Sequence, residues 1–237
     1  RPDTQAHIVD RVAYVESFAE KAKQAGAKYL MGYRVTNISS NSEYASVTYS
    51  DEQRRDTLKA RALVVANGFG GDLTNQLGLG KVGDYVTGVQ AEVLAPGLEQ
   101  VHIYLGQKTA PGFFAWLVPT SGGKALVGLL SRKNGQIHMN ALILKLQMEG
   151  KITAVTKEPT RWGVPLRPLG KTYGDRLLVV GDAAGQVKPT TGGGIYYAFL
   201  ASEIAADTLH TAFRNGSLSA AQLSVYEKGW KALLTRE

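Results

Sequence analysis

The residues best able to do chemistry follow a short apolar run near the C-terminal end of the chain. Residues 177–180 are apolar, Gly181 and Asp182 follow them, and the three glycines at 192–194 open a long apolar segment. Such a run predicts a buried strand. Free backbone N–H groups at a helix start attract anions and electron-rich ligand edges, and an aspartate after a buried strand can accept hydrogen bonds from sugar-type hydroxyls. The segment therefore predicts half of a nucleotide-cofactor site and favours a flavin.

Length and composition narrow the class of protein. The chain has 237 residues, of which 44% are hydrophobic and 20% are charged, enough for one large domain or two smaller ones. It has no cysteine, which excludes disulfides, thiolate catalysis and Cys-held metal centres within these residues. The four histidines are dispersed, so no metal site is predicted. No apolar run reaches the roughly 18 residues of a membrane span.

The charge balance bears on the partners. The net charge of +7 suits an anionic ligand or an acidic membrane surface, although a solvated surface with a modest positive excess is the plainer explanation. The Lys and Arg residues are scattered, which argues against nucleic acid as a partner. We therefore expect a cytoplasmic protein and leave peripheral contact with a membrane, and the oligomeric state, open.

The predicted secondary structure changes in kind along the chain. The first part predicts helix and short-strand segments, over residues 4–25, 28–31, 35–38, 45–49, 57–60 and 63–66. From about residue 82 the spacing predicts one larger antiparallel sheet with a helix, over residues 83–94, 100–105, 113–118, 124–131, 138–149 and 161–166. A helix over 193–213 follows the cofactor-type segment. The last helix opens with Ser219 and Gln222 as a capping box and with Leu218 and Leu223 as its hydrophobic staple.

Residues 181–195, continuing into two tyrosines and an alanine, resemble the flavin site of FAD-dependent oxidoreductases built like para-hydroxybenzoate hydroxylase. Within that fold the pattern is most similar to the geranylgeranyl reductase family. The resemblance implies that Asp182, flanked by Gly181 and Ala183, binds the ribityl hydroxyls. It also implies that the backbone around the isoalloxazine and the pyrophosphate comes from the helix start, namely from Gly192, Gly193, Gly194 and Ile195.

Two earlier positions match the same family. Residues 62–68 resemble its Ala-Asp-Gly segment, with Asn67 in place of the aspartate, which keeps an acceptor oxygen but loses the charge. Arg11 matches an arginine that lies near the cofactor phosphates in these enzymes. A turn residue after a strand and a solvated helix arginine are the alternative readings of these two residues.

A second signature lies in the antiparallel part. Residues 113–119 resemble the Tyr-x-Trp-x-Phe-Pro motif of geranylgeranyl reductases, and also the Trp-x-Trp-x-Ile-Pro motif of flavin halogenases. In a strand, alternate residues share one face, and such a face could line an apolar slot for a prenyl chain. Plain sheet core is the alternative. The predicted pocket residues are Phe114, Trp116, Val118 and Pro119, with Trp162 closing the same pocket.

The resemblance implies a mixed α/β fold in which a partial FAD/NAD(P)-binding Rossmann-like domain is interrupted by an antiparallel-sheet substrate domain. The expected parts are the first FAD-binding part, the substrate domain, the second FAD-binding part and a C-terminal helix, over residues 1–80, 81–169, 170–216 and 217–237. The family begins with a strand and a Gly-x-Gly-x-x-Gly turn that this chain lacks. We therefore expect a segment on the order of a hundred residues, about one small domain, to be missing, and these residues alone to bind FAD poorly and to be inactive.

The activity implied by the resemblance is reduction of C=C bonds in a geranylgeranyl chain carried on a lipid or chlorophyll-type substrate. FAD would be the cofactor, and NAD(P)H or reduced ferredoxin the electron donor. Archaeal reductases of the family use a cysteine near the flavin, which is absent here, so no catalytic proton donor is assigned. The alternatives are a flavin-dependent monooxygenase or halogenase of the same fold, a dehydrogenase of the electron-transfer-flavoprotein–quinone type, and an inactive fragment or lipid-binding module.

Overall fold

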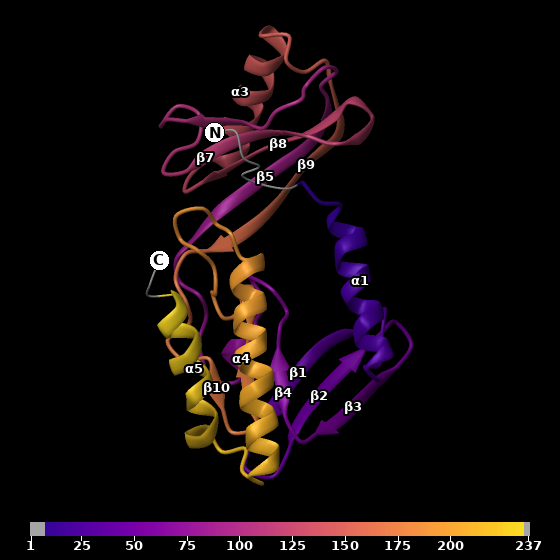
Figure 1. The fold of residues 1–237 in the computed structure, drawn as a ribbon, viewed down its shortest axis with the longest axis vertical. Helices are drawn as coiled ribbons and strands as arrows, with labels where there is room; N and C mark the ends of the chain where they lie inside the picture. The colour runs from indigo at the N-terminus through magenta and orange to yellow at the C-terminus, as the bar shows by residue number, and fades with distance from the viewer. Residues whose placement is uncertain (1–7, 235–237) are drawn as a thin grey trace.

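The computed structural model describes residues 8–234, which form three separate sheets and five helices (Figure 1). The elements before the large sheet are α1 (Arg11–Gln24), β1 (Arg34–Ser40), β2 (Ala45–Ser50), β3 (Arg55–Ala60), β4 (Leu63–Val65) and α2 (Leu73–Gln76). The large sheet and its helix comprise β5 (Tyr85–Leu94), β6 (His102–Leu105), β7 (Phe114–Pro119), β8 (Lys124–Ser131), α3 (Gly135–Met148) and β9 (Ala154–Pro165). The last elements are β10 (Tyr173–Gly174), β11 (Leu177–Val179), α4 (Ile195–Arg214) and α5 (Ala220–Leu234).

A short pair of parallel strands joins the segment before the large sheet to the segment after it. β4 and β11 pair in parallel, with Leu63 opposite Leu177 and Val65 opposite Val179, while β10 adds an antiparallel strand to β11. The large sheet lies between β4 and β11 in the sequence. The predicted mixed α/β architecture, an antiparallel sheet inserted into a unit with parallel pairing, is therefore confirmed. Among residues 8–234, no helix is long and apolar enough to cross a membrane.

The inserted sheet has five antiparallel strands in the order β6-β7-β8-β5-β9. Its side chains alternate between two faces, because successive residues of a strand point to opposite sides. One face is covered by α3 and forms a core cluster that includes Ala115, Leu117, Val127, Leu129 and Met139. The other face is turned toward the rest of the molecule (Figure 1).

A second core lies where α4 and α5 cover β11. The buried side of α4 carries small residues, including Ala201 and Ala205, so that α5 can approach closely. The predicted start of α5 is confirmed, since Ser219 Oγ accepts a hydrogen bond from the Gln222 N–H at 3.4 Å, and Leu218 and Leu223 are buried. This core fixes the axis of α4 against the end of β11.

The strand predicted over residues 28–31 is wrong. Residues 27–30 are irregular, and Tyr29, Leu30 and Met31 are exposed. A strand needs a hydrogen-bonding neighbour, and in the part of the chain that the structure describes no strand runs beside this segment. The apolar run alone carries no information about that partner.

The first helix starts later than predicted. Asp10 caps it by accepting hydrogen bonds from the N–H groups of Val12 and Ala13, so the helix begins at Arg11, and residues 4–7 lie outside the described residues. None of its side chains is buried. The predicted helix therefore forms, but the apolar side chains of its expected amphipathic face, Val12 and Val15 among them, are exposed. Toward the other end, β9 is longer than expected because polar residues continue its pairing with β5.

A buried hydrogen-bond chain links α5 to the end of β11. The Tyr226 hydroxyl donates to the Val179 carbonyl at 2.8 Å and accepts from Gln186 Nε2 at 2.8 Å. Gln186 Oε1 in turn accepts the Gly181 N–H at 2.8 Å. Burial raises the pKa of Tyr226, so the hydroxyl keeps its proton and its role as a donor.

We expect Tyr226→Phe to lower the free energy of unfolding by about 1–3 kcal/mol, because it leaves a buried carbonyl and a buried amide without their partner. Urea denaturation followed by circular dichroism measures this difference. Tyr85→Phe, at an exposed position of β5, is the matched control and should change stability by less than about 0.5 kcal/mol. Equal effects of the two substitutions would contradict the proposed importance of the hydrogen-bond chain.

Candidate functional site

The site begins with the turn that follows β11. Gly181 has a φ of +65°, a left-handed conformation that glycine adopts without steric cost, and it starts a single helical turn over Gly181–Ala183. Asp182 sits in that turn and is half-buried. A Cβ added to Gly194 would lie 2.7 Å from Asp182 Oδ1, so the carboxylate is in direct contact with the backbone at the start of α4. The predicted aspartate and the predicted helix start are therefore adjacent.

The glycine triplet is held against the large sheet. Gly192 has a φ of +69°, and a Cβ there would lie 2.8 Å from Leu130 Cδ1 and 3.4 Å from Val164 Cγ1. The preceding loop is closed by hydrogen bonds, since the Gly192 N–H donates to the Lys188 carbonyl and the Lys188 N–H donates to the Gly193 carbonyl. Only glycine suits position 192, where the backbone passes close to β8 and β9. The first turn of α4, like that of any helix, directs N–H groups without intrahelical acceptors toward the space before it.

A cleft of about 1120 Å³ opens beside this contact. Its walls come mainly from α1, the glycine triplet with the start of α4, and the end of β9, and the residues that follow β4 and β11 complete them. The predicted site residues that line it are Arg11, Trp162, Asp182, Gly192, Gly193, Gly194 and Ile195. An aromatic cluster closes the wall between the helices, where Phe18 of α1 lies 5.0 Å from Phe199 of α4 between ring centroids.

The electrostatics of the cleft centre on Asp182. Burial raises the pKa of its carboxyl group, because removal from water disfavours the charged form, and the positive charge of Arg11 partly opposes that rise. The charged carboxylate is therefore costly at this position unless hydrogen-bond donors are supplied to it, and a bound ligand with hydroxyl groups would supply them. Perturbed titration in a cleft is typical of functional sites.

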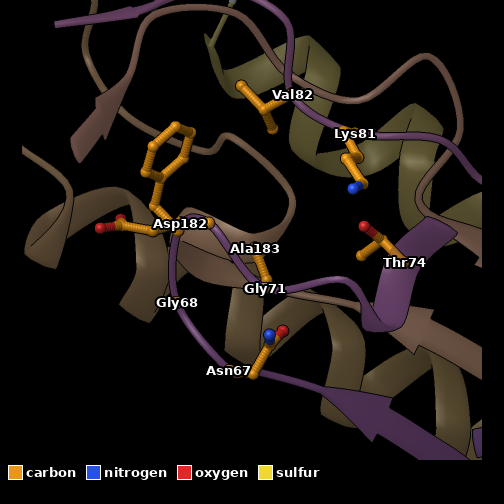
Figure 2. A pocket seen from close by; sticks show the side chains of 10 residues that line it. Asn67, Gly68, Gly71, Thr74, Lys81, Val82, Asp182 and Ala183 are labelled. Carbon is orange, nitrogen blue, oxygen red and sulfur yellow. The ribbon is translucent and has the colours of Figure 1, made fainter. Parts of the chain in front are cut away.

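Two other predicted residues lie on the far side of the same turn. Asn67 and Ala183 line a smaller cavity of about 80 Å³ together with Thr74 and Lys81 (Figure 2). A Cβ on Gly71 would lie 2.0 Å from Asn67 Nδ2, so this side chain packs on the loop that follows β4. Figure 2 shows the Asp182 carboxylate directed away from Lys81 and Thr74. Asn67 therefore borders the turn but does not line the larger cleft.

The second signature lies on the sheet face opposite α3. Ala115 and Leu117 are buried beneath α3, which leaves the alternate residues of β7, including Phe114 and Trp116, on the other face. Trp116 covers Gly128 of β8, where a Cβ would lie 2.4 Å from the indole Cζ2. Its Nε1 donates to Gln90 Oε1 at 3.3 Å.

Trp162 repeats this arrangement on the same face of the sheet, on the edge strand β9. It pairs in register with Gly88 of β5, where a Cβ would lie 2.4 Å from the indole Cε2. We call the surface formed by Trp116, Trp162, Gly88 and Gly128 the two-tryptophan face. Sequence reasoning missed both glycines, although a glycine inside a strand is a known sign of close approach by another group.

Only part of the predicted substrate pocket borders the cleft. Trp162 lines it, whereas Phe114, Trp116, Val118 and Pro119 do not. Trp116 instead packs on the apolar cluster of Leu130, Val164 and neighbouring residues, which forms the wall between the sheet and the glycine triplet. Phe114, Trp116 and Val118 thus share the sheet face that is turned toward the cleft, whereas Pro119 pairs with Ala125 and lies on the face covered by α3.

Comparison with protein families gives one match that decides the relationship. The FAD binding domain family matches residues 7–227, which is nearly the whole chain. This chain belongs to the FAD binding domain family. The residues that line the cleft, among them Asp182 and the glycine-rich helix start, lie within the matched range.

Similar proteins include reductases. A digeranylgeranylglycerophospholipid reductase from Methanocaldococcus jannaschii is 29% identical over 238 residues, covering 96% of this chain and 61% of the relative. A digeranylgeranylglycerophospholipid reductase 2 from Methanopyrus kandleri is 28% identical, covering 95% and 61%. The chain thus spans about three fifths of the length of these relatives.

Solved structures show the same fold. A geranylgeranyl bacteriochlorophyll reductase-like protein from Thermoplasma acidophilum has a TM-score of 0.82 at 21% identity, covering 95% of this chain and 61% of the other. The flavin-dependent halogenase CmlS has a TM-score of 0.75 at 17% identity, covering 94% and 44%. The fold is therefore shared by reductases and halogenases, and fold alone does not choose between their reactions.

The raised pKa of Asp182 predicts how stability depends on pH. A carboxyl whose folded pKa lies above its unfolded value stabilises the fold most at low pH, and this contribution is lost as the pH rises through the folded value. We expect Asp182→Asn to match the wild type at acidic pH and to exceed its free energy of unfolding increasingly toward neutral pH. Urea denaturation from about pH 4 to about pH 7 measures the difference.

Arg11→Gln tests the cause of this pH dependence. Removal of the opposing positive charge should raise the pKa of Asp182 further, and the stability of the Arg11→Gln variant should fall more steeply with pH than that of the wild type. In the double variant with Asp182→Asn this steeper dependence should disappear. A difference that stays constant across the pH range would contradict the assignment of a buried carboxyl.

Proposed function

We propose that the protein is an FAD-dependent oxidoreductase that reduces C=C bonds of a geranylgeranyl chain carried on a lipid or chlorophyll-type molecule. The observation that carries the proposal is the contact of Asp182 with the glycine start of α4, at a cleft that Trp162 of the two-tryptophan face also lines. Reductases with prenyl-lipid names among the similar proteins support the choice of substrate class.

The residues of the cleft suit the parts of FAD. Asp182 offers carboxylate oxygens that can accept from the ribityl hydroxyls, and the backbone of Gly194 and Ile195 offers N–H groups to an electron-rich ring edge, whereas the Gly193 N–H donates to Thr191 Oγ1. A positive helix end stabilises negative charge that develops there. Arg11 brings a cation to the same cleft, which suits phosphate groups. When bound and reduced, FAD supplies the hydride donor.

The two-tryptophan face suits a chain without polar handles. A prenyl tail must be held by shape and apolar area, and each indole lies flat over a glycine, which leaves a smooth aromatic surface. Trp162 extends this surface into the cleft, and Phe114 lies next to Trp116 along β7, at 6.0 Å between ring centroids. In this role these residues hold an alkene near the flavin and exclude water from it. NAD(P)H or reduced ferredoxin is the proposed source of electrons.

A reaction assay tests the activity. The complete gene product, purified with its flavin and reduced under anaerobic conditions, should add two hydrogens to each reduced double bond of a digeranylgeranyl glycerolipid, which mass spectrometry of the lipid detects. Unchanged chains under these conditions would contradict the proposal. A hydroxylated or halogenated product formed only in air would replace it with the monooxygenase or halogenase alternative.

Adjacent glycines allow a matched test of the cofactor site. A Cβ at position 194 would lie 2.7 Å from Asp182 Oδ1, whereas at position 193 the nearest atom would be Thr191 Oγ1 at 3.3 Å. We expect Gly194→Ala to weaken FAD binding at least about tenfold, a cost near 1.4 kcal/mol, because it displaces the carboxylate. Gly193→Ala should stay within about threefold of the wild type. Titration of the apoprotein with FAD, followed by flavin fluorescence, measures both, and a reversed order would contradict the assigned role of Asp182.

A further inference from the structure

Helix α3 is apolar on two sides but packs on only one. Its inner side chains, among them Met139 and Leu142, are buried in the core of the large sheet. On the outer side, Ile137, Leu144 and Met148 are 66%, 61% and 89% exposed. They recur at helical spacing and so form one stripe. The outer side of a surface helix normally carries polar or charged residues, so an exposed apolar stripe on the outer side of α3 is unusual for a surface in water.

The position of α3 favours a flat partner. The helix is the outermost layer at one end of the long axis of the molecule, on the side of the sheet away from α4 and α5 (Figure 1). It therefore presents a ridge to its surroundings. A stable protein–protein interface buries about 1,200–2,000 Å² with some 20 residues on each side, which is far more than a stripe of three large side chains offers. Insertion of a few apolar side chains into a lipid surface needs no such area.

The charge around α3 indicates the kind of surface. Residues 81–169 contain ten Lys or Arg and five Asp or Glu, so this part of the chain carries most of the net charge of +7. Residues 135–148 contain no acidic residue, and Glu149, which follows them, is paired with Lys145 and Lys151. Lys133 is exposed just before the helix, and the exposed Lys108 lies beside it because its carbonyl is 3.1 Å from His138 Nδ1. Long basic side chains at the rim of an apolar stripe suit the headgroups of anionic lipids.

We propose that the outer face of α3 docks the protein on an anionic lipid surface, with Ile137, Leu144 and Met148 inserted at the boundary between headgroups and acyl chains. The surface is defined by its own residues and does not depend on the proposed reaction. The proposed function gives it a purpose, because a prenyl-lipid substrate resides in a bilayer.

The edge strand beneath α3 offers a route from this surface to the two-tryptophan face. Lys145 Nζ of α3 lies 5.8 Å from the centre of the Tyr104 ring, so this side chain reaches the edge strand β6. On the opposite side of that strand, Ile103 and Leu105 are exposed and pair in register with Trp116 and Phe114. An apolar row therefore connects the β6 edge of the sheet with Phe114 and Trp116 of β7.

Vesicle sedimentation tests the docking surface without any prenyl lipid, so its outcome is separate from that of the reductase assay. The wild type should sediment with vesicles of phosphatidylglycerol, bind phosphatidylcholine at least about tenfold more weakly, and be released by raised salt. The triple variant Ile137→Gln, Leu144→Gln, Met148→Gln should lose at least about tenfold in partitioning to phosphatidylglycerol. Lys108→Gln with Lys133→Gln should lose about fivefold for each charge removed.

Val225→Gln is the matched control. Val225 is exposed on α5, at a distance from the proposed surface, and its substitution should leave vesicle binding unchanged. Circular dichroism melting shows whether each variant is folded. Absence of wild-type binding to phosphatidylglycerol, or equal binding by the triple variant, would overturn the proposal. Concentration-dependent self-association that the triple variant abolishes, without vesicle binding, would instead assign the face to contact between copies of the chain.

Discussion

The contact between the Asp182 carboxylate and the glycine start of α4 is the constraint on which the rest of the site depends. It requires a residue without a side chain at position 194, a sharp turn after β11 and a fixed axis for α4. The parallel pairing of β4 with β11 sets the position of the turn, and the buried hydrogen bonds of Gln186 and Tyr226 tie it to α5. Burial of the carboxyl raises its pKa and therefore costs stability at neutral pH. A cost of this kind is typical of sites shaped for a ligand.

A second close approach couples the two parts of the molecule. Gly192 lies against Leu130 and Val164, so the loop that carries the helix start rests on the strands that carry the apolar face. A side chain at this position would push the glycine triplet away from the sheet. Since Trp162 belongs to the same strand as Val164 and also lines the cleft, the spacing between cofactor residues and sheet residues is set by backbone contact. A fixed spacing matters for any reaction between two bound molecules, because small displacements of reacting groups are costly.

Sequence patterns predicted an element well where residues close to it in the sequence determine its structure. The alternation of β5 to β8, the capping box at Ser219 and the glycine-rich start of α4 depend on neighbouring residues, and the structure has these elements close to the predicted bounds. The segment at 28–31 failed because a strand needs a partner that local sequence does not name. Gly88 and Gly128 were missed for the same reason, since each receives an indole from a neighbouring strand. Asn67 was recognised by type, but only the folded loop after β4 shows that it packs on Gly71 and lies outside the larger cleft.

One energetic argument connects the proposed docking of α3 on lipid with the proposed binding of a prenyl chain by the two-tryptophan face. Transfer of a prenyl chain from a bilayer into water costs about 0.8 kcal/mol for each CH₂ group exposed, so a chain-reducing protein gains from apolar surface that is continuous from membrane to cleft. The exposed residues of β6, Phe114 and Trp116 of β7, and Trp162 of β9 lie on one face of the sheet, and Gly128 of β8 and Gly88 of β5 lie beneath the two indoles. The docking of α3 on anionic lipid would bring the exposed residues of β6 to the membrane. On this view the sheet is a path along which the substrate reaches the cofactor without crossing water.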